Sequence, residues 1–261
     1  MKYMKFFNYY IMSALFCIVA FAGCEIDNYD APNSTIEGKI TDHTGQPFQV
    51  NHGASIIRMR EISWADDNPD VYISNRSLKV QQDATYRHTK IFKGTYRMLP
   101  VGGAFYPYDD NFRQNEDDAG EIVEINNTAT KDFSVTPYLM IEWVDKPTVD
   151  AAGYLSCSVK FKRIQKPGYE MPNAYRANMS ISRTLNAGAG DGDLFTTQIN
   201  LNNSMEDQVI TFKTVRPLKW YGIRYLVRIS MSCQQASSAS NYPGMGASNY
   251  STIEEINVPA R

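Results

Sequence analysis

Histidine and cysteine are scarce in this chain. Among its 261 residues there are three histidines (His43, His52 and His88) and four cysteines. No HExxH or HxH motif and no Cys/His cluster accompanies the histidines. Zinc and iron sites in proteins draw on clustered nitrogen and sulfur ligands. The sequence therefore predicts no metal site.

Motifs that hold phosphate or activate a nucleophile are also missing. There is no GxxxxGK[ST], no GxGxxG that opens a helix, and no GxSxG. The glycine-rich run "NAGAGDGDLF" (186–195) leads into a strand-like segment, so we interpret it as a hairpin loop. A catalytic triad or a carboxylate pair that meets only in space leaves no spacing signature. We predict no catalytic residues and no cofactor, and a hydrolase is the least favoured alternative.

Charge of one sign is not in excess. The chain has 26 basic and 28 acidic residues and a formal net charge of −2. Nucleic-acid binding depends on basic surface that neutralises phosphates, so we expect no nucleic-acid partner. The acidic segments 65–70, 108–118 and 191–193 do not have the EF-hand spacing. We interpret them as solvated loops.

The N-terminus lacks a hydrophobic run of membrane-spanning length. Its apolar stretch, 11–22, has twelve residues, whereas a spanning helix needs about 20. Two lysines precede the stretch, and Ala22 and Gly23 precede Cys24. This layout predicts a lipoprotein signal peptide (1–23) and lipid attachment at Cys24, although Phe21 stands where leucine is usual. A plain secretory signal cut nearby and an uncleaved anchor are the alternatives.

Two cysteines, Cys157 and Cys233, remain after Cys17 leaves with the signal peptide and Cys24 receives lipid. They are too few for a disulfide framework. Each is in phase with the apolar alternation of its segment, "YLSCSVKF" or "IRYLVRISMSCQ". Two separately buried thiols are the favoured interpretation, and a disulfide between them is the alternative.

Helical periodicity is almost absent from the remainder of the chain. Short runs of alternating apolar and polar residues recur, separated by turn residues, which is typical of β-strands. We predict an all-β fold of two β-sandwich domains, transthyretin-like and then Ig-like or prealbumin-like, at 35–136 and 137–261, with a polar tether at 24–34. The strand-like runs are 35–41, 54–62, 77–81, 90–99, 121–125, 131–136, 138–144, 153–164, 175–184, 194–201, 208–215, 221–233 and 250–258. We interpret 234–249 as a loop.

Aromatic residues are abundant, with 17 Tyr, 12 Phe and 3 Trp. Trp64, Tyr106 and Tyr108 are in predicted loops, and Asp109 and Asp110 follow directly. An aromatic ring can cover the apolar face of a sugar while carboxylates accept hydrogen bonds from its hydroxyls. These five residues are our predicted glycan-binding set. The alternative is that the rings fill the ends of the sandwiches or the seam between them.

Several phrases resemble a known family. "TIEGKITDHTGQPFQ" is similar to the opening of transthyretin-like, carboxypeptidase-regulatory-type sandwiches. "IIRMREISW", "TKIFKGTYRM", "GGAFYPY", "FSVTPYLMIEW", "YLVRISMSC" and "NYSTIEEINV" follow in an order that resembles the Bacteroidetes lipoprotein family named domain of unknown function 3823 (DUF3823). One departure is Asp83-Ala84, where we expect a glycine-containing turn.

The resemblance implies a two-domain lipoprotein encoded beside outer-membrane glycan-uptake transporters and their starch-binding-like partner lipoproteins. It supplies no catalytic residues. We therefore predict a non-catalytic protein that is lipid-anchored in the outer membrane, faces the cell exterior, and acts as an accessory or polysaccharide-binding component of a Sus-like uptake system. Acidic residues just after Cys24 accompany export to the outer face in the resembled group. The alternative is a spacer or docking protein for the transporter complex without glycan contact.

Overall fold

A computed structural model describes the greater part of the chain, in the segments 31–63, 68, 72–113, 117–188, 197–219, 221–234 and 244–260. The predicted signal peptide, Cys24 and Trp64 lie outside the described residues. Within these segments no helix has the length and apolarity needed to span a membrane.

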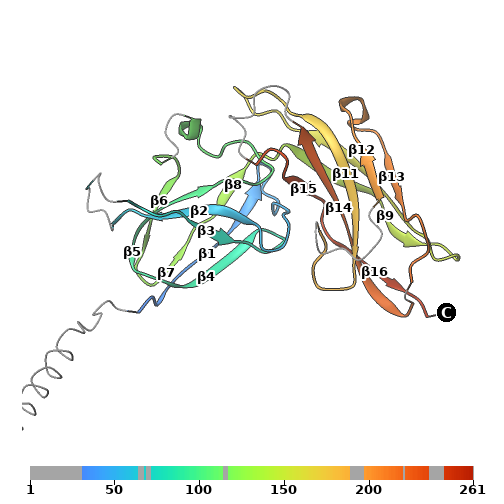
Figure 1. The fold of residues 1–261 in the computed structure, drawn as a ribbon, viewed down its shortest axis with the longest axis horizontal. Helices are drawn as coiled ribbons and strands as arrows, with labels where there is room; N and C mark the ends of the chain where they lie inside the picture. The colour runs from blue at the N-terminus through green and yellow to red at the C-terminus, as the bar shows by residue number, and fades with distance from the viewer. Residues whose placement is uncertain are drawn as a thin grey trace, which may run out of the picture.

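The first half of the chain forms two four-stranded sheets (Figure 1). Their strands are β1 (Ser34–Asp42), β2 (Ser55–Glu61), β3 (Arg76–Lys79), β4 (Thr85–Ile91), β5 (Gly94–Pro100), β6 (Glu121–Ile125), β7 (Thr128–Thr130) and β8 (Phe133–Val135). In one sheet β1 lies between β4 and β7 and also pairs with β8, and the other sheet has the order β3-β2-β5-β6. A short 3-10 helix, η2 (Asp110–Arg113), precedes β6.

The two sheets enclose one hydrophobic core. Ile36 and Ile40 on β1 face Ile57, Met98 and Ile125 of the other sheet, and all five are buried. Alternation along each strand sends these side chains to one face and the charged side chains to the other. Burial of each such side chain contributes about 1.5–3 kcal/mol, which holds the sheets together as a sandwich.

The second half of the chain forms a three-stranded and a five-stranded sheet. Their strands are β9 (Leu139–Val149), β10 (Leu155–Arg163), β11 (Asn173–Ser182), β12 (Thr197–Asn200), β13 (Ile210–Lys213), β14 (Ile223–Gln234), β15 (Ser248–Tyr250) and β16 (Glu254–Val258), with a 3-10 helix η3 (Asn203–Met205). The orders are β13-β10-β9 and β12-β11-β14-β15, and β16 also pairs with β14. The inward residues of β10 and β14 meet in a second core.

The predicted all-β fold is confirmed, and three strand assignments need correction. Thr128–Thr130 is strand β7, paired in parallel with β1, whereas the alternation predicts no strand between residues 125 and 131. The run 90–99 continues β4, which begins at Thr85, and then forms β5 after a break. Strand β15 (Ser248–Tyr250) begins inside the expected loop 234–249 and includes the first residue of the expected strand 250–258. Strands of three residues are too short for alternation to indicate them.

The departure at Asp83-Ala84 preserves the backbone shape of the expected glycine turn. Ala84 has a φ of +57°, in the left-handed region that glycine favours. The Asp83 carboxylate accepts hydrogen bonds from the backbone N and the hydroxyl of Thr85, at 3.1 and 2.7 Å. This side chain therefore stabilises the turn locally.

Cys157 and Cys233 are free, buried thiols. The Cys157 thiol contacts the sulfur of Met179 at 3.6 Å. Burial raises the pKa of each thiol to about 12, so both remain protonated and unreactive at neutral pH. This agrees with the interpretation of two separately buried side chains.

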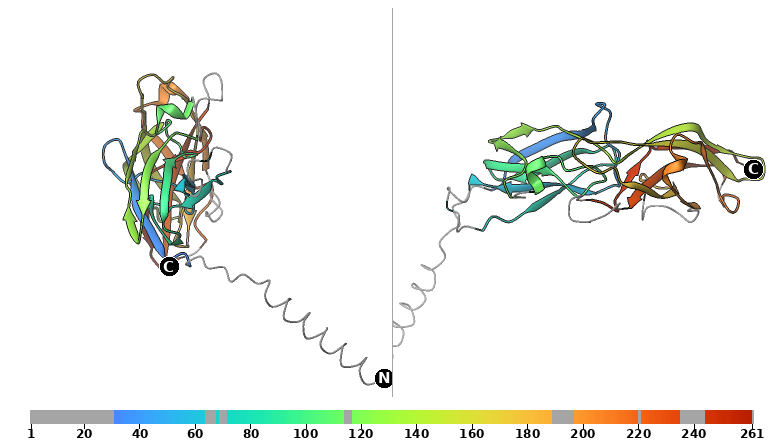
Figure 2. Two further views of the ribbon diagram at one scale, coloured as in Figure 1. Left: turned by 90° about the vertical axis from the view of Figure 1, so that its left-hand side faces the viewer. Right: turned by 90° about the horizontal axis from the view of Figure 1, so that it is seen from above.

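The two sandwiches lie end to end, with the C-terminus at the far end of the second one (Figure 2). Backbone bonds join them where the chain crosses. The amide of Tyr106 donates to the carbonyl of Thr136 at 2.9 Å, and that of Tyr138 donates to the carbonyl of Ala104 at 3.1 Å. The same Ala104 carbonyl accepts from the side-chain amide of Asn249 on β15 at 2.8 Å. We call this contact region the seam.

A fully buried arginine, Arg228 on β14, reaches across the seam. Its guanidinium donates from Nη1 to the carbonyl of Val50 at 2.6 Å, and from Nη2 to the side-chain oxygen of Gln49 at 3.1 Å and the carbonyl of Gln82 at 3.4 Å. All three acceptors belong to the first sandwich. Charge-assisted hydrogen bonds of this kind are among the stronger ones in proteins.

The remaining donors of Arg228 bind its own sandwich. Nε donates to the carbonyl of Ser251 at 3.0 Å and Nη1 also donates to that of Ala187 at 3.3 Å, while the guanidinium carbon lies 4.5 Å from the Tyr250 ring centroid. Burial lowers the pKa of Arg228 to about 10, so the side chain is charged at neutral pH. One buried cation thus ties together segments from both sandwiches.

Candidate functional site

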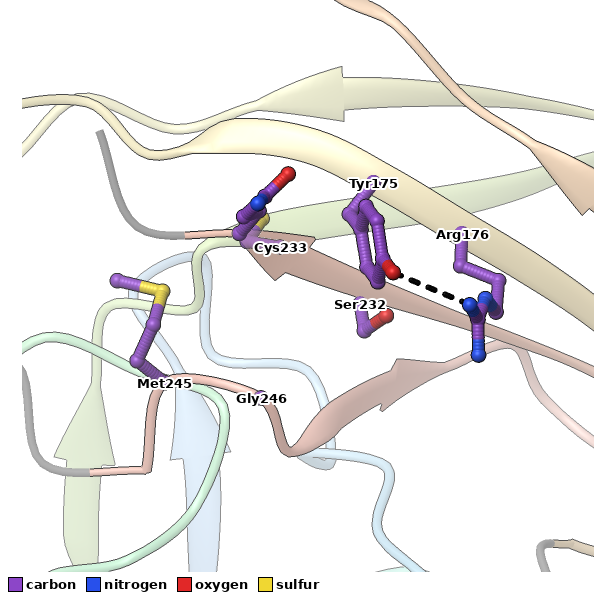
Figure 3. Close-up of a pocket in the computed structure, with 7 residues that line it drawn as sticks. Tyr175, Arg176, Ser232, Cys233, Met245 and Gly246 are labelled. Carbon is purple, nitrogen blue, oxygen red and sulfur yellow. Dashed lines mark hydrogen bonds between the residues drawn. The ribbon is translucent and has the colours of Figure 1, made fainter.

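An open hollow of about 670 Å³ lies on the second sandwich beside the seam (Figure 3). We call it the Tyr175 groove. Its lining residues are Tyr175 and Arg176 from β11, Ser232, Cys233 and Gln234 from the end of β14, and Met245 and Gly246 from the segment before β15. Small-molecule sites in proteins commonly have volumes of 300–1,000 Å³ and often occur at domain interfaces.

A β-bulge creates one wall of the groove. Across β11 and β14, Ala174 pairs with Cys233 and Arg176 pairs with Ser232, so Tyr175 is the extra residue. Ala174 is buried, whereas Tyr175 and Arg176 both lie outside the core. A bulge shifts the alternation by one residue, so that two consecutive side chains emerge from the sheet surface together.

Tyr175 and Arg176 pack against each other on this wall. The guanidinium carbon of Arg176 lies 4.8 Å from the Tyr175 ring centroid, and Nη2 donates to the Tyr175 hydroxyl at 3.1 Å (Figure 3). Tyr175 nevertheless stays 39% exposed. The cation supports the ring from one side and leaves part of its surface to solvent. This geometry suits a stacking platform with limited side-chain freedom.

The Arg176 side chain has unused hydrogen-bonding capacity. Its Nε is buried and has no hydrogen-bond partner among the described residues. A buried donor without a partner costs about 1–3 kcal/mol. Only the Tyr175 hydroxyl accepts a bond from Arg176 within the described segments.

A row of polar side chains crosses the sheet and meets the groove at Arg176 and Ser232. Arg176 on β11 pairs with Asn200 on β12 and with Ser232 on β14, and Ser232 pairs with Ser248 on β15. Directly opposed residues of an antiparallel sheet project from the same face. All four are at least partly exposed. The row therefore offers hydroxyl and amide groups that can both donate and accept hydrogen bonds.

The opposite wall rests on the first sandwich. Gly244 has a φ of +79°, and a Cβ built there would stand 2.0 Å from the carbonyl oxygen of Gly103. This close approach brings the segment with Met245 and Gly246 against the loop before Tyr106. Figure 3 shows Met245 across the groove from Cys233.

Tyr106, a predicted sugar platform, lies inside the seam. Its ring is 1% exposed and packs edge-to-face on Tyr138 and Tyr169, with centroid distances of 4.8 and 5.6 Å. Its hydroxyl donates to the carbonyl of Ile164 at 2.7 Å. The prediction for Tyr106 needs correction, because a ring with no exposed face cannot stack on a sugar. The burial matches the alternative that the rings fill the seam.

Tyr108 and Asp109 support the first sandwich. The Tyr108 hydroxyl donates to the carboxylate of Glu121, and its ring packs edge-to-face on Phe133 at 5.5 Å. Burial, followed by the contact with Glu121, raises the pKa of Tyr108. The Asp109 carboxylate accepts from the backbone N of Asn111 and of Gly120, both at 2.9 Å. Both side chains therefore have structural partners.

Asp110 bridges the two sandwiches at their surface. Its carboxylate accepts from Lys166 Nζ at 2.9 Å and from the Tyr169 hydroxyl at 2.7 Å. Lys166 Nζ also donates to the carbonyl of Pro107 at 2.7 Å. The Asp110 side chain remains 74% exposed, so it stays accessible to a ligand. The structure thus separates the four described members of the predicted set among the core, the seam and the surface.

The residues of the Tyr175 groove were not in the predicted set. Tyr175 and Arg176 are in a strand-like run, where alternation assigns their side chains to opposite faces. A bulge leaves no reliable mark in a single sequence, since the partner strand decides where the extra residue fits. The adjacent aromatic and basic residues were the only available signal. Among the described residues, no group of three or more histidine, cysteine or acidic side chains is placed to hold a metal ion.

The fold and groove define an all-β protein of two linked β-sandwiches with an open polar groove beside their seam. Residues 34–136 match the family profile described as "Protein of unknown function (DUF3823) N-terminal domain". The predicted resemblance to the DUF3823 family is confirmed, and the profile match covers the first sandwich. No curated protein matches the sequence.

Solved structures share the fold along nearly the whole described chain. A DUF3823 family protein from Bacteroides uniformis is 23% identical, with a TM-score of 0.69, and the match covers 87% of this chain and 100% of that one. One from Parabacteroides merdae is 17% identical, with a TM-score of 0.62 and the same coverage. A Bacteroides uniformis protein described as "a putative carbohydrate binding protein" is 17% identical, with a TM-score of 0.64 and the same coverage.

Proposed function

We propose that this protein is a non-catalytic glycan-binding protein and that the Tyr175 groove is its binding site. The observation that carries the proposal is the bulge on β11, which exposes Tyr175 in a groove that also contains the polar side chains of Ser232 and Gln234. A sugar presents an apolar C–H face and a rim of hydroxyls. The Tyr175 ring can cover the face, and Ser232 and Gln234 can bind hydroxyls.

Two further observations support a binding role. The groove is open to solvent, so a segment of a longer chain can enter it, and its thiol, Cys233, has a pKa of about 12 and cannot act as a nucleophile at neutral pH. A structure with the same fold is described as "a putative carbohydrate binding protein". That likeness supports the proposal through the fold alone.

The proposed setting follows from the N-terminal sequence and the family resemblance. Lipid on Cys24 anchors the protein in the outer membrane, facing the cell exterior, as an accessory component of a Sus-like polysaccharide-uptake system. Its protein partners in this proposal are the outer-membrane transporter and the partner lipoprotein. The groove would hold a polysaccharide near the transporter.

Binding of the intact protein to a panel of oligosaccharides, measured by calorimetry, tests the proposal. Replacement of Tyr175 by alanine should weaken binding by about tenfold, which corresponds to the loss of one stacking contact. Tyr72→Ala is the matched control, because Tyr72 is 85% exposed and does not line the groove. Absence of binding to every glycan, or equal loss in both variants, would overturn the proposal.

The Arg228 contacts favour a second candidate function, a spacer or docking protein without glycan contact. A buried cation with acceptors in both sandwiches holds them in one orientation, as a rigid spacer requires. This candidate predicts that co-purification with the transporter survives Tyr175→Ala and is lost when Arg228 is replaced. Glycan binding would then be absent from the intact protein.

A further inference from the structure

The charge pattern of the Tyr175 groove points to a ligand class. We infer that the groove selects glycans bearing an anionic group, either a uronate carboxylate or a sulfate ester, and that Arg176 is the residue that recognises it. This inference rests on the proposed glycan-binding function and extends it to the chemistry of the ligand.

Arg176 is the single charged side chain among the seven lining residues. The cross-strand neighbours that share its face, Asn200 and Ser232, are uncharged. Within the described segments no carboxylate forms an ion pair with its guanidinium. Among the described residues, therefore, nothing neutralises the positive charge of the groove.

Two other partly buried arginines have carboxylate partners. Arg163 pairs with Glu206 at 2.9 Å, and Arg60 pairs with Asp117 at 2.5 Å. Arg176 shares with Arg60 a buried Nε without a partner among the described residues, but unlike Arg60 it has no carboxylate partner there, and its Nη2 donates to the Tyr175 hydroxyl. The missing carboxylate distinguishes Arg176, and within the described segments its guanidinium is incompletely satisfied.

The geometry suits an anion carried on a sugar ring. A guanidinium binds carboxylate and sulfate oxygens through paired N–H donors. Its position beside the Tyr175 ring means that a sugar lying on the ring can bring a ring substituent to Arg176. The bulge is again responsible, because it brings the platform and the cation to one face as sequence neighbours.

Calorimetry with paired ligands tests the inference without altering the protein. The uronate arm compares an oligogalacturonide with its methyl-ester counterpart, and the sulfate arm compares a carrageenan oligosaccharide with its desulfated counterpart. We expect the charged member of at least one pair to bind about tenfold or more tightly. The preference should weaken with added salt, since screening reduces the attraction at a partly exposed site.

Variants then assign the preference to one side chain. Arg176→Gln should abolish the preference, and it should weaken binding of the neutral ligand less than binding of the charged one, because Arg176 also supports the Tyr175 ring. Arg176→Lys should retain only part of the preference because the paired donors are lost. Arg224→Gln on β14 is the control for net charge, as Arg224 pairs with Glu255 outside the groove.

The outcomes separate the inference from the proposed function. If charged and neutral ligands bind with equal affinity and Tyr175→Ala weakens the binding of both, the inference is overturned and the glycan-binding function stands. A preference that persists in Arg176→Gln would also overturn it. Absence of binding to all four ligands and to the wider glycan panel would overturn both.

Discussion

Arg228 Nη1 donates a 2.6 Å hydrogen bond to the backbone carbonyl of Val50, across 178 positions of sequence and from one sandwich to the other. The donor is fully buried and so is the acceptor's residue. A cation buried at such a site is tolerated because carbonyls surround it. This contact is a directional bond between the two sandwiches, in addition to the apolar packing of Tyr106 on Tyr138.

Replacement of Arg228 by methionine should destabilise the protein by roughly 3 kcal/mol, because several buried carbonyls lose their donor. Urea unfolding monitored by tryptophan fluorescence measures the change, and small-angle scattering should show a broader range of interdomain orientations. Arg224→Met is the control on the same strand. Its ion pair with Glu255 is largely exposed, so the loss should be under about 1 kcal/mol. Equal effects of the two variants would contradict the role of Arg228.

Tyr106→Phe should lower the stability of the protein without changing its affinity for glycans. The variant loses the hydrogen bond to the Ile164 carbonyl and keeps the ring packing, so we expect about 1 kcal/mol lower stability. Glycan affinity should remain that of the unaltered protein. A selective loss of glycan binding in Tyr106→Phe would restore Tyr106 to the binding set.

Gly244→Ala should damage the groove wall and the seam together. A Cβ at this position meets the carbonyl of Gly103, and the φ of +79° also disfavours alanine. We expect a loss of at least 2 kcal/mol, roughly the left-handed strain plus the displacement of packed backbone. Gly246→Ala is the control. Gly246 also has a positive φ, +96°, but a Cβ added there would have no atom within 4 Å. This control substitution should cost about 1 kcal/mol, and thermal unfolding compares the two.

Stability should fall as the pH rises above 9. Burial raises the pKa of Cys157 and Cys233 from 9.0 to about 12. Above pH 9 the thiols of the unfolded chain ionise, whereas those of the folded protein keep their protons. Ionisation therefore lowers the free energy of the unfolded state alone. Stability from a raised pKa is complete below pH 9 and is lost as the pH approaches 12.

Above its pKa in the unfolded chain, each thiol should lower the free energy of unfolding by roughly 1 kcal/mol per pH unit. Urea midpoints at pH 8, 9 and 10 measure this decline. The double variant Cys157→Ala/Cys233→Ala should decline less steeply, although Tyr96, whose pKa burial raises to about 12, keeps some slope in it. Arg228, with its pKa lowered to about 10, acts in the opposite direction only above pH 10. Identical slopes for the two proteins would contradict the burial of the thiols.

Mass spectrometry of the mature protein should find Cys24 as the N-terminal residue, carrying a diacylglyceryl thioether and an N-acyl group. Cys24→Ala should abolish lipid attachment and release the protein from the membrane fraction. Shaving of intact cells with protease tests exposure to the exterior. A mature N-terminus at another position would contradict the lipoprotein signal.

The strands with clear alternation were predictable from the sequence, since each face of a half-buried strand repeats every second residue. Along β10, Leu155, Cys157, Val159 and Phe161 are all buried, as their spacing predicts. The order of the family phrases also indicated the fold correctly. These features depend on local pattern, which a single sequence contains.

The roles of Arg228, Tyr106 and Tyr175 were decided by tertiary structure alone. Alternation places Arg224 and Arg228 on the same outward face of β14, yet one is partly exposed and the other is covered by the first sandwich. Tyr106 has the loop context of a binding residue and is buried because the second sandwich packs on it. Tyr175 emerges from its strand because β14 pairs around it in a bulge. Local sequence determined which segments are strands, whereas partners distant in sequence determined which side chains reach solvent.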